Sequence, residues 1–185
     1  MELVTVAAGI PVVPVLLLGF ILGVWSVWTI NSFRIKKIKV SESLSGVEVA
    51  LTKRYDLLAK LLDASKGYLA HERAVFMDTV EVRKDMTLSQ ISQTEDRMDA
   101  VTEQVYAVAE KYPVLKSSQV FLELQAGIQD AEHHLEAARR VYNSNVKIYN
   151  TSIAKFPNCL LAAGRKPEAF FQAKKGVHVD LKITF

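Results

Sequence analysis

The chain has 185 residues and a formal net charge of +3 at pH 7. Its 23 basic and 20 acidic residues are nearly balanced and mixed along the chain, which argues against a protein that binds nucleic acid. Because there is a single cysteine, an internal disulfide bond is excluded.

The N-terminal part of the chain carries no charged side chain from Leu3 to Phe33. An apolar run longer than about 18 residues is typical of a transmembrane helix. Pro14 suits the first turn of that helix, and the stretch from Pro14 to Phe33 spans one hydrocarbon layer at about 1.5 Å of rise per residue. We therefore predict that residues 1–33 form an N-terminal segment and a transmembrane helix. A cleaved signal peptide is the weaker alternative, because no basic residue precedes the run.

Aromatic and basic side chains mark the end of the apolar run. Tryptophans favour the headgroup region of a bilayer, and clustered basic residues favour its cytoplasmic side. This pattern predicts a single-pass membrane protein with its N-terminus outside and residues 34–185 in the cytoplasm. Membrane lipid is an expected partner, because basic side chains attract anionic headgroups. The residues predicted at the membrane interface are Trp25, Trp28, Arg34, Lys36, Lys37 and Lys39.

The sequence beyond the membrane predicts an all-α bundle of three long helices and a short C-terminal one. Large apolar residues recur at seven-residue spacing, which is typical of helices packed side by side. The long helices are expected at residues 14–68, 72–111 and 118–156, with antiparallel neighbours because the connections are short. A short helix at residues 169–173 ends the bundle domain, residues 34–173. The predicted seam contains Leu51, Leu58, Val105, Phe121, Ile128, Leu135, Tyr142 and Tyr149.

Two further patterns predict a homo-oligomer. Gly19 and Gly23 form a Gly-x-x-x-Gly motif, which lets transmembrane helices approach closely. In the tail, residues 174–185, apolar and polar residues alternate as they do in a strand. Because a lone strand is unstable in water, this tail is either disordered or paired with the tail of another chain. Its apolar positions are Val177, Val179, Leu181, Ile183 and Phe185.

The sequence holds no recognisable catalytic or cofactor-binding motif. Asp130 and His134 share a helix face, and we interpret them as solvated residues rather than metal ligands. Cys159 lies among apolar residues and is expected to be a buried, inert thiol. Asn143 and Asn150 lie at the edge of the seam, where they are expected to hydrogen-bond between helices. We therefore expect neither an enzyme nor a protein with a metal or cofactor.

Several blocks of the sequence resemble the LemA family. They fall within residues 31–185 in the family's order: Lys53–Leu58, Lys66–Glu72, Ala109–Lys116, Phe121–Gln125, Ala138–Asn150, Phe156–Pro157 and Lys166–Phe171. The resemblance implies one N-terminal span, an antiparallel helical domain in the cytoplasm, and a place in the bacterial cytoplasmic (inner) membrane. It implies no catalytic residue. Ala59 stands where members often have proline, so a straight first helix is expected.

Two hypotheses about function follow. In the first, the protein is a non-enzymatic, membrane-anchored bundle that self-associates and organises or shapes membrane, as is implied by a relative in magnetosome-forming bacteria that is implicated in building internal membranes. In the second, the bundle is an adaptor or sensor for another membrane protein, such as a membrane protease, because family members are discussed beside membrane zinc metalloproteases. A large homo-oligomer would favour the first, and a stoichiometric complex with another membrane protein would favour the second.

Overall fold

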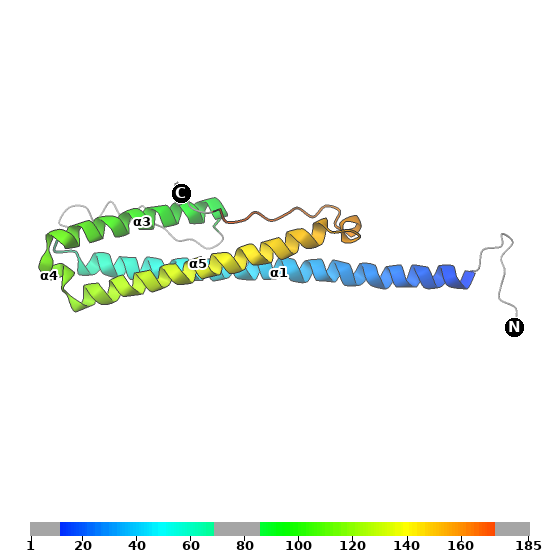
Figure 1. The fold of residues 1–185 in the computed structure, drawn as a ribbon, viewed down its shortest axis with the longest axis horizontal. Helices are drawn as coiled ribbons and strands as arrows, with labels where there is room; N and C mark the ends of the chain where they lie inside the picture. The colour runs from blue at the N-terminus through cyan, green and yellow to red at the C-terminus, as the bar shows by residue number, and fades with distance from the viewer. Residues whose placement is uncertain (1–11, 69–85, 173–185) are drawn as a thin grey trace, which may run out of the picture. The chain divides into compact units, whose positions relative to one another are not determined.

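The computed structural model describes residues 12–68 and 86–172. The elements, shown in Figure 1, are the helices α1 (Val12–Ala64), α3 (Leu88–Lys111), α4 (Pro113–Lys116) and α5 (Gln119–Ala154) and the 3-10 helix η1 (Asn158–Leu161). Among these described residues there is no strand. The predicted all-α fold, a long apolar N-terminal helix followed by a helical bundle, is confirmed. The tail predicted as a possible strand lies outside the described residues.

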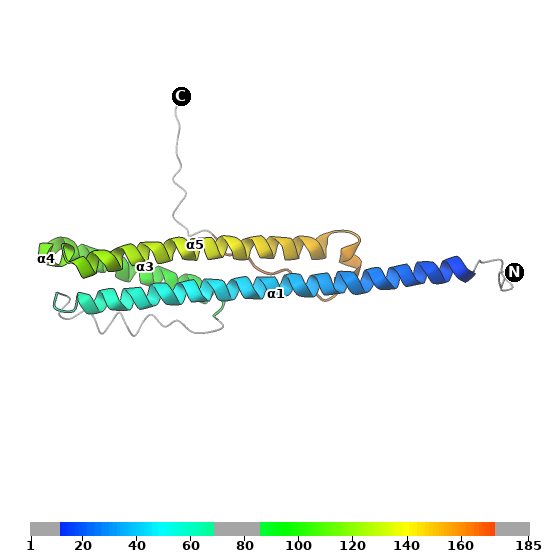
Figure 2. The ribbon, with the colours of Figure 1, turned by 90° about the horizontal axis from the view of Figure 1, so that it is seen from below.

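The described residues form two compact units, each built from segments far apart in the sequence. The N-terminal unit contains residues 12–41 and 144–169, and the bundle unit contains residues 42–68, 86–143 and 170–172. Helices α1 and α5 contribute to both units. Within the bundle unit, α1, α3 and α5 run side by side, as Figures 1 and 2 both show.

Helix α1 has two parts with different surfaces. A window of 18 residues in its apolar part has a mean hydropathy of 2.1, and only 6 % of it is buried. Of the helices in the described part of the chain, α1 is the one that is long and apolar enough to cross a membrane. Its later part buries a stripe in the bundle unit, where Val47, Leu51 and Leu61 are 0 % exposed. The helix therefore changes from apolar on all sides to apolar on one side.

The second long helix begins later than the sequence predicted. A helix from residue 72 was expected, but Met86 and Thr87 are not helical and α3 begins at Leu88. Thr87 is the N-cap: its Oγ1 accepts a hydrogen bond from the Gln90 N–H, and the Gln90 side chain accepts one from the Thr87 N–H. This capping box favours a helix start here because it satisfies backbone donors that have no helical partner. Residues 72–85 lie outside the described part.

Prolines interrupt the helices at the predicted places. Helix α3 ends at Lys111, just before Tyr112 and Pro113, because the residue before a proline is forced out of the helical conformation. Pro113 then opens the short helix α4, which the sequence analysis did not predict, since the fixed φ of proline suits a first helical turn. Helix α5 ends at Ala154, close to the predicted stop at Phe156.

The short helix predicted at residues 169–173 is not present: residues 169–172 are non-helical, and the short C-terminal helix is instead η1. In the bundle unit, the backbone N–H and C=O of Phe171 are both hydrogen-bonded to the side chain of Asn143. In the N-terminal unit, Asn150 binds the backbone of Glu168 in the same way. Backbone groups already bonded to side-chain amides are not available for helical hydrogen bonds.

The predicted seam residues are at most 4 % exposed. In the bundle unit, the rings of Tyr106 on α3 and Phe121 on α5 meet edge to face, with centroids 6.3 Å apart. Helices α1 and α5 approach closely at Gly127, where a Cβ atom would lie 3.4 Å from Leu57 Cδ2. Close packing of this kind makes the loss of even a few core atoms costly.

The buried face of α5 is tested by Ile128→Ala. Ile128 is 1 % exposed, so the variant should lose about 2–5 kcal/mol of unfolding free energy through lost burial and a new cavity. The control is Gln129→Ala on the exposed face, which should change stability by less than about 0.5 kcal/mol. Denaturant unfolding of the full chain in mild detergent, followed by circular dichroism, measures both. Equal losses would contradict this assignment of the buried face.

Candidate functional site

The first candidate site is the apolar part of α1, which exposes side chains on every side. Leu16, Phe20 and Ile21 are 67 %, 71 % and 61 % exposed. The predicted contact glycines, Gly19 and Gly23, are open: a Cβ atom added to either meets no atom within 4 Å. This surface is covered by nothing in the described N-terminal unit.

The predicted interface residues follow this surface along α1. Trp25 is half-buried and Trp28 is 72 % exposed. Of the basic residues, Arg34 and Lys39 are exposed and Lys36 is half-buried. Lys37 Nζ lies 2.9 Å from Glu168 Oε1, and the hydrogen bond and the charge of this carboxylate raise the pKa of Lys37 above its usual value. The basic positions thus surround the helix rather than lining one side.

Asn143 and Asn150 act as clamps on extended backbone. In the N-terminal unit, Asn150 Oδ1 accepts from the Glu168 N–H and its Nδ2 donates to the Glu168 carbonyl, each at 2.9 Å. In the bundle unit, Asn143 makes the same pair of bonds with Phe171, at 2.9 and 3.1 Å. The two asparagines were expected to hydrogen-bond between helices. Their partner is instead the segment that follows η1.

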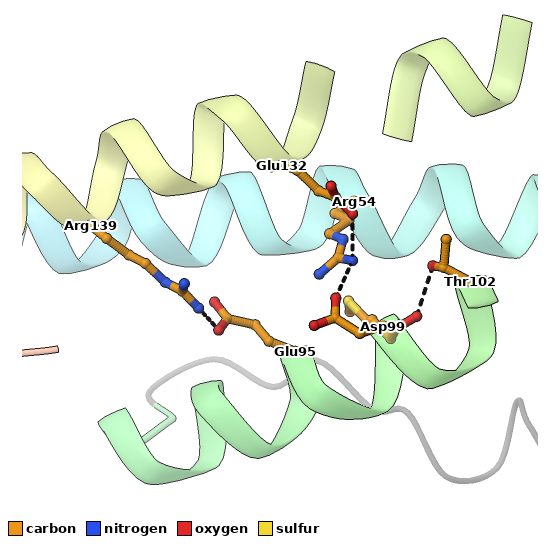
Figure 3. Close-up of polar contacts among 7 residues, drawn as sticks. Arg54, Glu95, Asp99, Thr102, Glu132 and Arg139 are labelled. Atoms are coloured by element: carbon orange, nitrogen blue, oxygen red, sulfur yellow. Dashed lines mark hydrogen bonds and ion pairs between the residues drawn. The ribbon is translucent and has the colours of Figure 1, made fainter. Parts of the chain in front are cut away.

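The second candidate site is a charge network inside the bundle unit, where three helices meet (Figure 3). Arg54 on α1 is 2 % exposed, and its Nη2 lies 2.5 Å from Asp99 Oδ1 on α3 and 2.7 Å from Glu132 Oε1 on α5. Charge-assisted hydrogen bonds of a guanidinium to carboxylates are among the stronger side-chain contacts. One arginine therefore ties together all three long helices.

A third ion pair lies beside Arg54. Glu95 on α3 is 0 % exposed and pairs with Arg139 on α5. Arg139 also lies over the ring of Phe171, 5.7 Å from its centroid. Removing a buried ion from water costs several kcal/mol, so such an ion is tolerated only with a close counter-ion. The pair therefore links the α3–α5 contact to the extended segment that Asn143 holds.

A cavity of about 440 Å³ adjoins these three ion pairs. The residues that line it are Arg54, Glu95, Asp99, Glu132, Leu135, Glu136 and Arg139. The sequence analysis did not predict this network. A signal was present, because Glu95 and Asp99 are spaced i,i+4 beside the buried Ile91 and Met98.

The structure also bears on the predictions made for Cys159 and for the pair Asp130 and His134. Cys159 is exposed, so the prediction of a buried thiol is wrong. The apolar residues around it in sequence form η1, whose described residues are not buried. His134 Nε2 lies 3.4 Å from Asp130 Oδ1, and both side chains are more than half exposed. Asp130 also pairs with Lys53 at 3.0 Å, and this hydrogen bond lowers the pKa of Asp130.

The pair of Glu95 and Arg139 gives a prediction about stability. Arg139→Met should lose on the order of 3 kcal/mol, because it leaves the Glu95 carboxylate buried without a counter-ion. The double variant Glu95→Leu/Arg139→Met should recover most of this loss, since apolar residues often replace a buried pair at little cost. Both losses are measured by denaturant unfolding in mild detergent. A double variant as unstable as the single one would contradict the role given to the pair.

Comparison with known proteins agrees with this architecture. The sequence model of the LemA family matches residues 43–185, which is well over half of the chain. Protein LemA of Metamycoplasma hominis is 24 % identical over 156 residues, covering 79 % of this chain and 70 % of that relative. The match begins after the apolar part of α1 and includes the helices that carry the charge network. The chain therefore belongs to the LemA family.

Proposed function

We propose that the protein is a non-enzymatic bundle, anchored in the bacterial cytoplasmic membrane by α1, that self-associates and organises or shapes the membrane. The observation that carries the proposal is the uncovered apolar part of α1. The bundle unit lies in the cytoplasm and the N-terminus lies outside. No cofactor takes part in this function.

The distribution of exposed apolar residues supports insertion rather than docking to a soluble partner. A helix that docks in a groove needs one apolar stripe, whereas a helix surrounded by lipid is apolar on all sides. In α1 the uncovered residues include consecutive positions, such as Leu16, Leu17 and Leu18 at 67 %, 58 % and 59 %. Burying one such side chain contributes about 1.5–3 kcal/mol, so a bilayer would stabilise this segment strongly.

The basic residues that follow the span support the proposed orientation. The described part of α1 has its first basic residue at Arg34, and Lys36, Lys37 and Lys39 follow within two turns. Basic residues next to a span resist translocation, which favours the cytoplasmic side for them. The bundle unit follows them in sequence and is therefore placed on the same side.

Two features support self-association, one within the membrane and one in the tail. The Gly19 and Gly23 positions have open space around them, and small residues four apart create a shallow surface on which a second helix packs closely. Association between spans depends on such packing, because lipid tails are as apolar as the side chains. The tail at residues 177–185 is the second expected contact, and it lies outside the described part of the chain.

An adaptor role is the second candidate, and one observation favours it. In the bundle unit, Val114 on α4 and Val120 and Leu122 on α5 are 74 %, 55 % and 47 % exposed. Exposed apolar side chains on α4 and in the first turn of α5 offer a surface for contact with another protein. In this alternative the end of the bundle at α4 binds another membrane protein, such as a membrane protease. A complex of fixed stoichiometry with that protein, in place of a homo-oligomer, would support it.

The glycine contact is tested by Gly19→Leu/Gly23→Leu. A Cβ atom at either position meets no neighbouring side chain within 4 Å, so lost association would report an intermolecular contact. The particle extracted in mild detergent should contain fewer subunits, as measured by light scattering after size exclusion. Gly46→Leu is the matched control, because Gly46 is also helical and open but lies outside the apolar run, and it should leave the particle mass unchanged. An unchanged mass for the double variant would argue against this contact.

The orientation is tested with a single exposed cysteine. Gln104 is exposed on α3, so Gln104→Cys in a Cys159→Ser background places the only thiol on the bundle unit. In intact cells this thiol should not react with a membrane-impermeant maleimide, and it should react after lysis. Labelling before lysis would place the bundle outside the cytoplasm and reverse the proposed topology.

A further inference from the structure

In the N-terminal unit, Arg165 and Lys166 lie near the basic segment of α1. A cavity of about 380 Å³ is lined by Phe33, Arg34, Lys37, Tyr149, Gly164, Arg165 and Lys166. Four of these side chains are cationic, and none is acidic. Lys37 pairs with Glu168, which does not line the cavity. The cavity therefore keeps an excess of positive charge.

The backbone after η1 holds this arrangement in place. Gly164 has φ +78°, a left-handed conformation that favours glycine, and it lies in the turn that precedes the two cations. The Arg165 guanidinium then lies 5.0 Å from the ring centroid of the buried Phe33, and its Nη1 donates to the Leu161 carbonyl at 3.3 Å. Because these contacts fix the arginine, the cation is positioned before any ligand arrives.

Exposed apolar side chains precede Arg165 and Lys166 in the chain by no more than about ten residues. Phe156, just after α5, is 73 % exposed, and Leu160, in η1, is 68 % exposed. A site for a free anion needs no such neighbours, whereas a lipid site needs both a cationic pocket and an apolar surface. Phe33, at the end of the uncharged run of α1, lines the same cavity, which places the cavity at the headgroup level of the proposed span.

We propose that this cavity binds the phosphate group of an anionic phospholipid, with Arg34, Lys37, Arg165 and Lys166 as its cationic ligands. Phe156 and Leu160 insert beside it at the boundary between headgroups and acyl chains. This inference rests on the proposed insertion of α1. It goes beyond that insertion in two ways. The segment around η1 would make a second contact with the membrane, and the protein would prefer anionic lipids.

The test compares two double variants of the full-length protein in nonionic detergent. Arg165→Gln/Lys166→Gln removes two ligands, and Lys111→Gln/Lys116→Gln makes the same charge change on exposed residues of the bundle unit. Native mass spectrometry measures the affinity of each for phosphatidylglycerol and phosphatidylcholine. The first variant should bind phosphatidylglycerol about 30-fold more weakly than wild type, at about 1 kcal/mol per basic residue. The control should stay within about threefold, and phosphatidylcholine binding should change in neither.

Three outcomes would overturn the lipid site. Equal weakening in both variants would mean that net charge alone attracts the lipid. No weakening in the first variant, with its helicity intact by circular dichroism, would remove the cavity as the site. Thermal stabilisation of the wild type by inorganic phosphate as large as that by phosphatidylglycerol would identify a free-anion site instead.

A separate readout distinguishes failure of the lipid site from failure of the anchor. Wild type and the Arg165→Gln/Lys166→Gln variant should both resist extraction from membranes by alkaline carbonate, because α1 holds them. Release of the wild type would contradict the proposed span itself, whatever the lipid affinities are.

The sole cysteine provides a direct probe of the apolar contact. Cys159 is exposed and lies next to Leu160, so a nitrobenzoxadiazole fluorophore on Cys159 reports the surroundings of η1. In vesicles containing phosphatidylglycerol its emission should shift to the blue and be quenched by lipids labelled near the headgroup. Emission typical of water, without quenching, would show that η1 does not reach the bilayer and would contradict the inserted contact.

Discussion

Helix α1 has two kinds of surface that require different surroundings, and the organisation of the chain depends on that difference. Its first part is apolar around the whole circumference and is left uncovered by the N-terminal unit. Its later part buries one stripe, including Val47, Leu51 and Leu58, in the bundle unit, where α1 runs beside α3 and α5 (Figures 1 and 2). Apolar surface is stabilised where water is removed, so lipid would stabilise the first part as the proposed span, whereas neighbouring helices stabilise the second.

In the bundle unit, apolar packing alone does not distinguish one register of the helices from another. Heptad seams can slide by whole repeats at modest cost, whereas a buried ion cannot leave its counter-ion. Arg54, placed between Asp99 and Glu132, and Glu95, paired with Arg139, supply this constraint on all three long helices. We interpret the network as the feature that specifies how the helices align, with stability supplied mainly by the apolar seam.

The segment after η1 has no regular structure, yet each unit holds its part of it by a repeated contact. Asn150 and Asn143 each bind both backbone groups of one residue, Glu168 and Phe171, as a neighbouring strand would. In the N-terminal unit this keeps Glu168 beside Lys37, close in sequence to Arg165 and Lys166. The segment after η1, which has no core of its own, thereby places Glu168, Arg165 and Lys166 near the basic residues of α1.

The sequence by itself determined the features that depend on local pattern: the apolar span, the seven-residue stripes and the proline stops, because periodicity and proline geometry act within a few residues. The start of α3 at Leu88 is also set locally, by the capping box of Thr87 and Gln90, which the heptad pattern does not reveal. Only the tertiary structure decided which charges are buried together and where the extended segment lies. Arg54 meets partners 45 and 78 residues away, and Asn143 meets one 28 residues away. No spacing rule joins such residues, because their proximity exists only once the helices have packed.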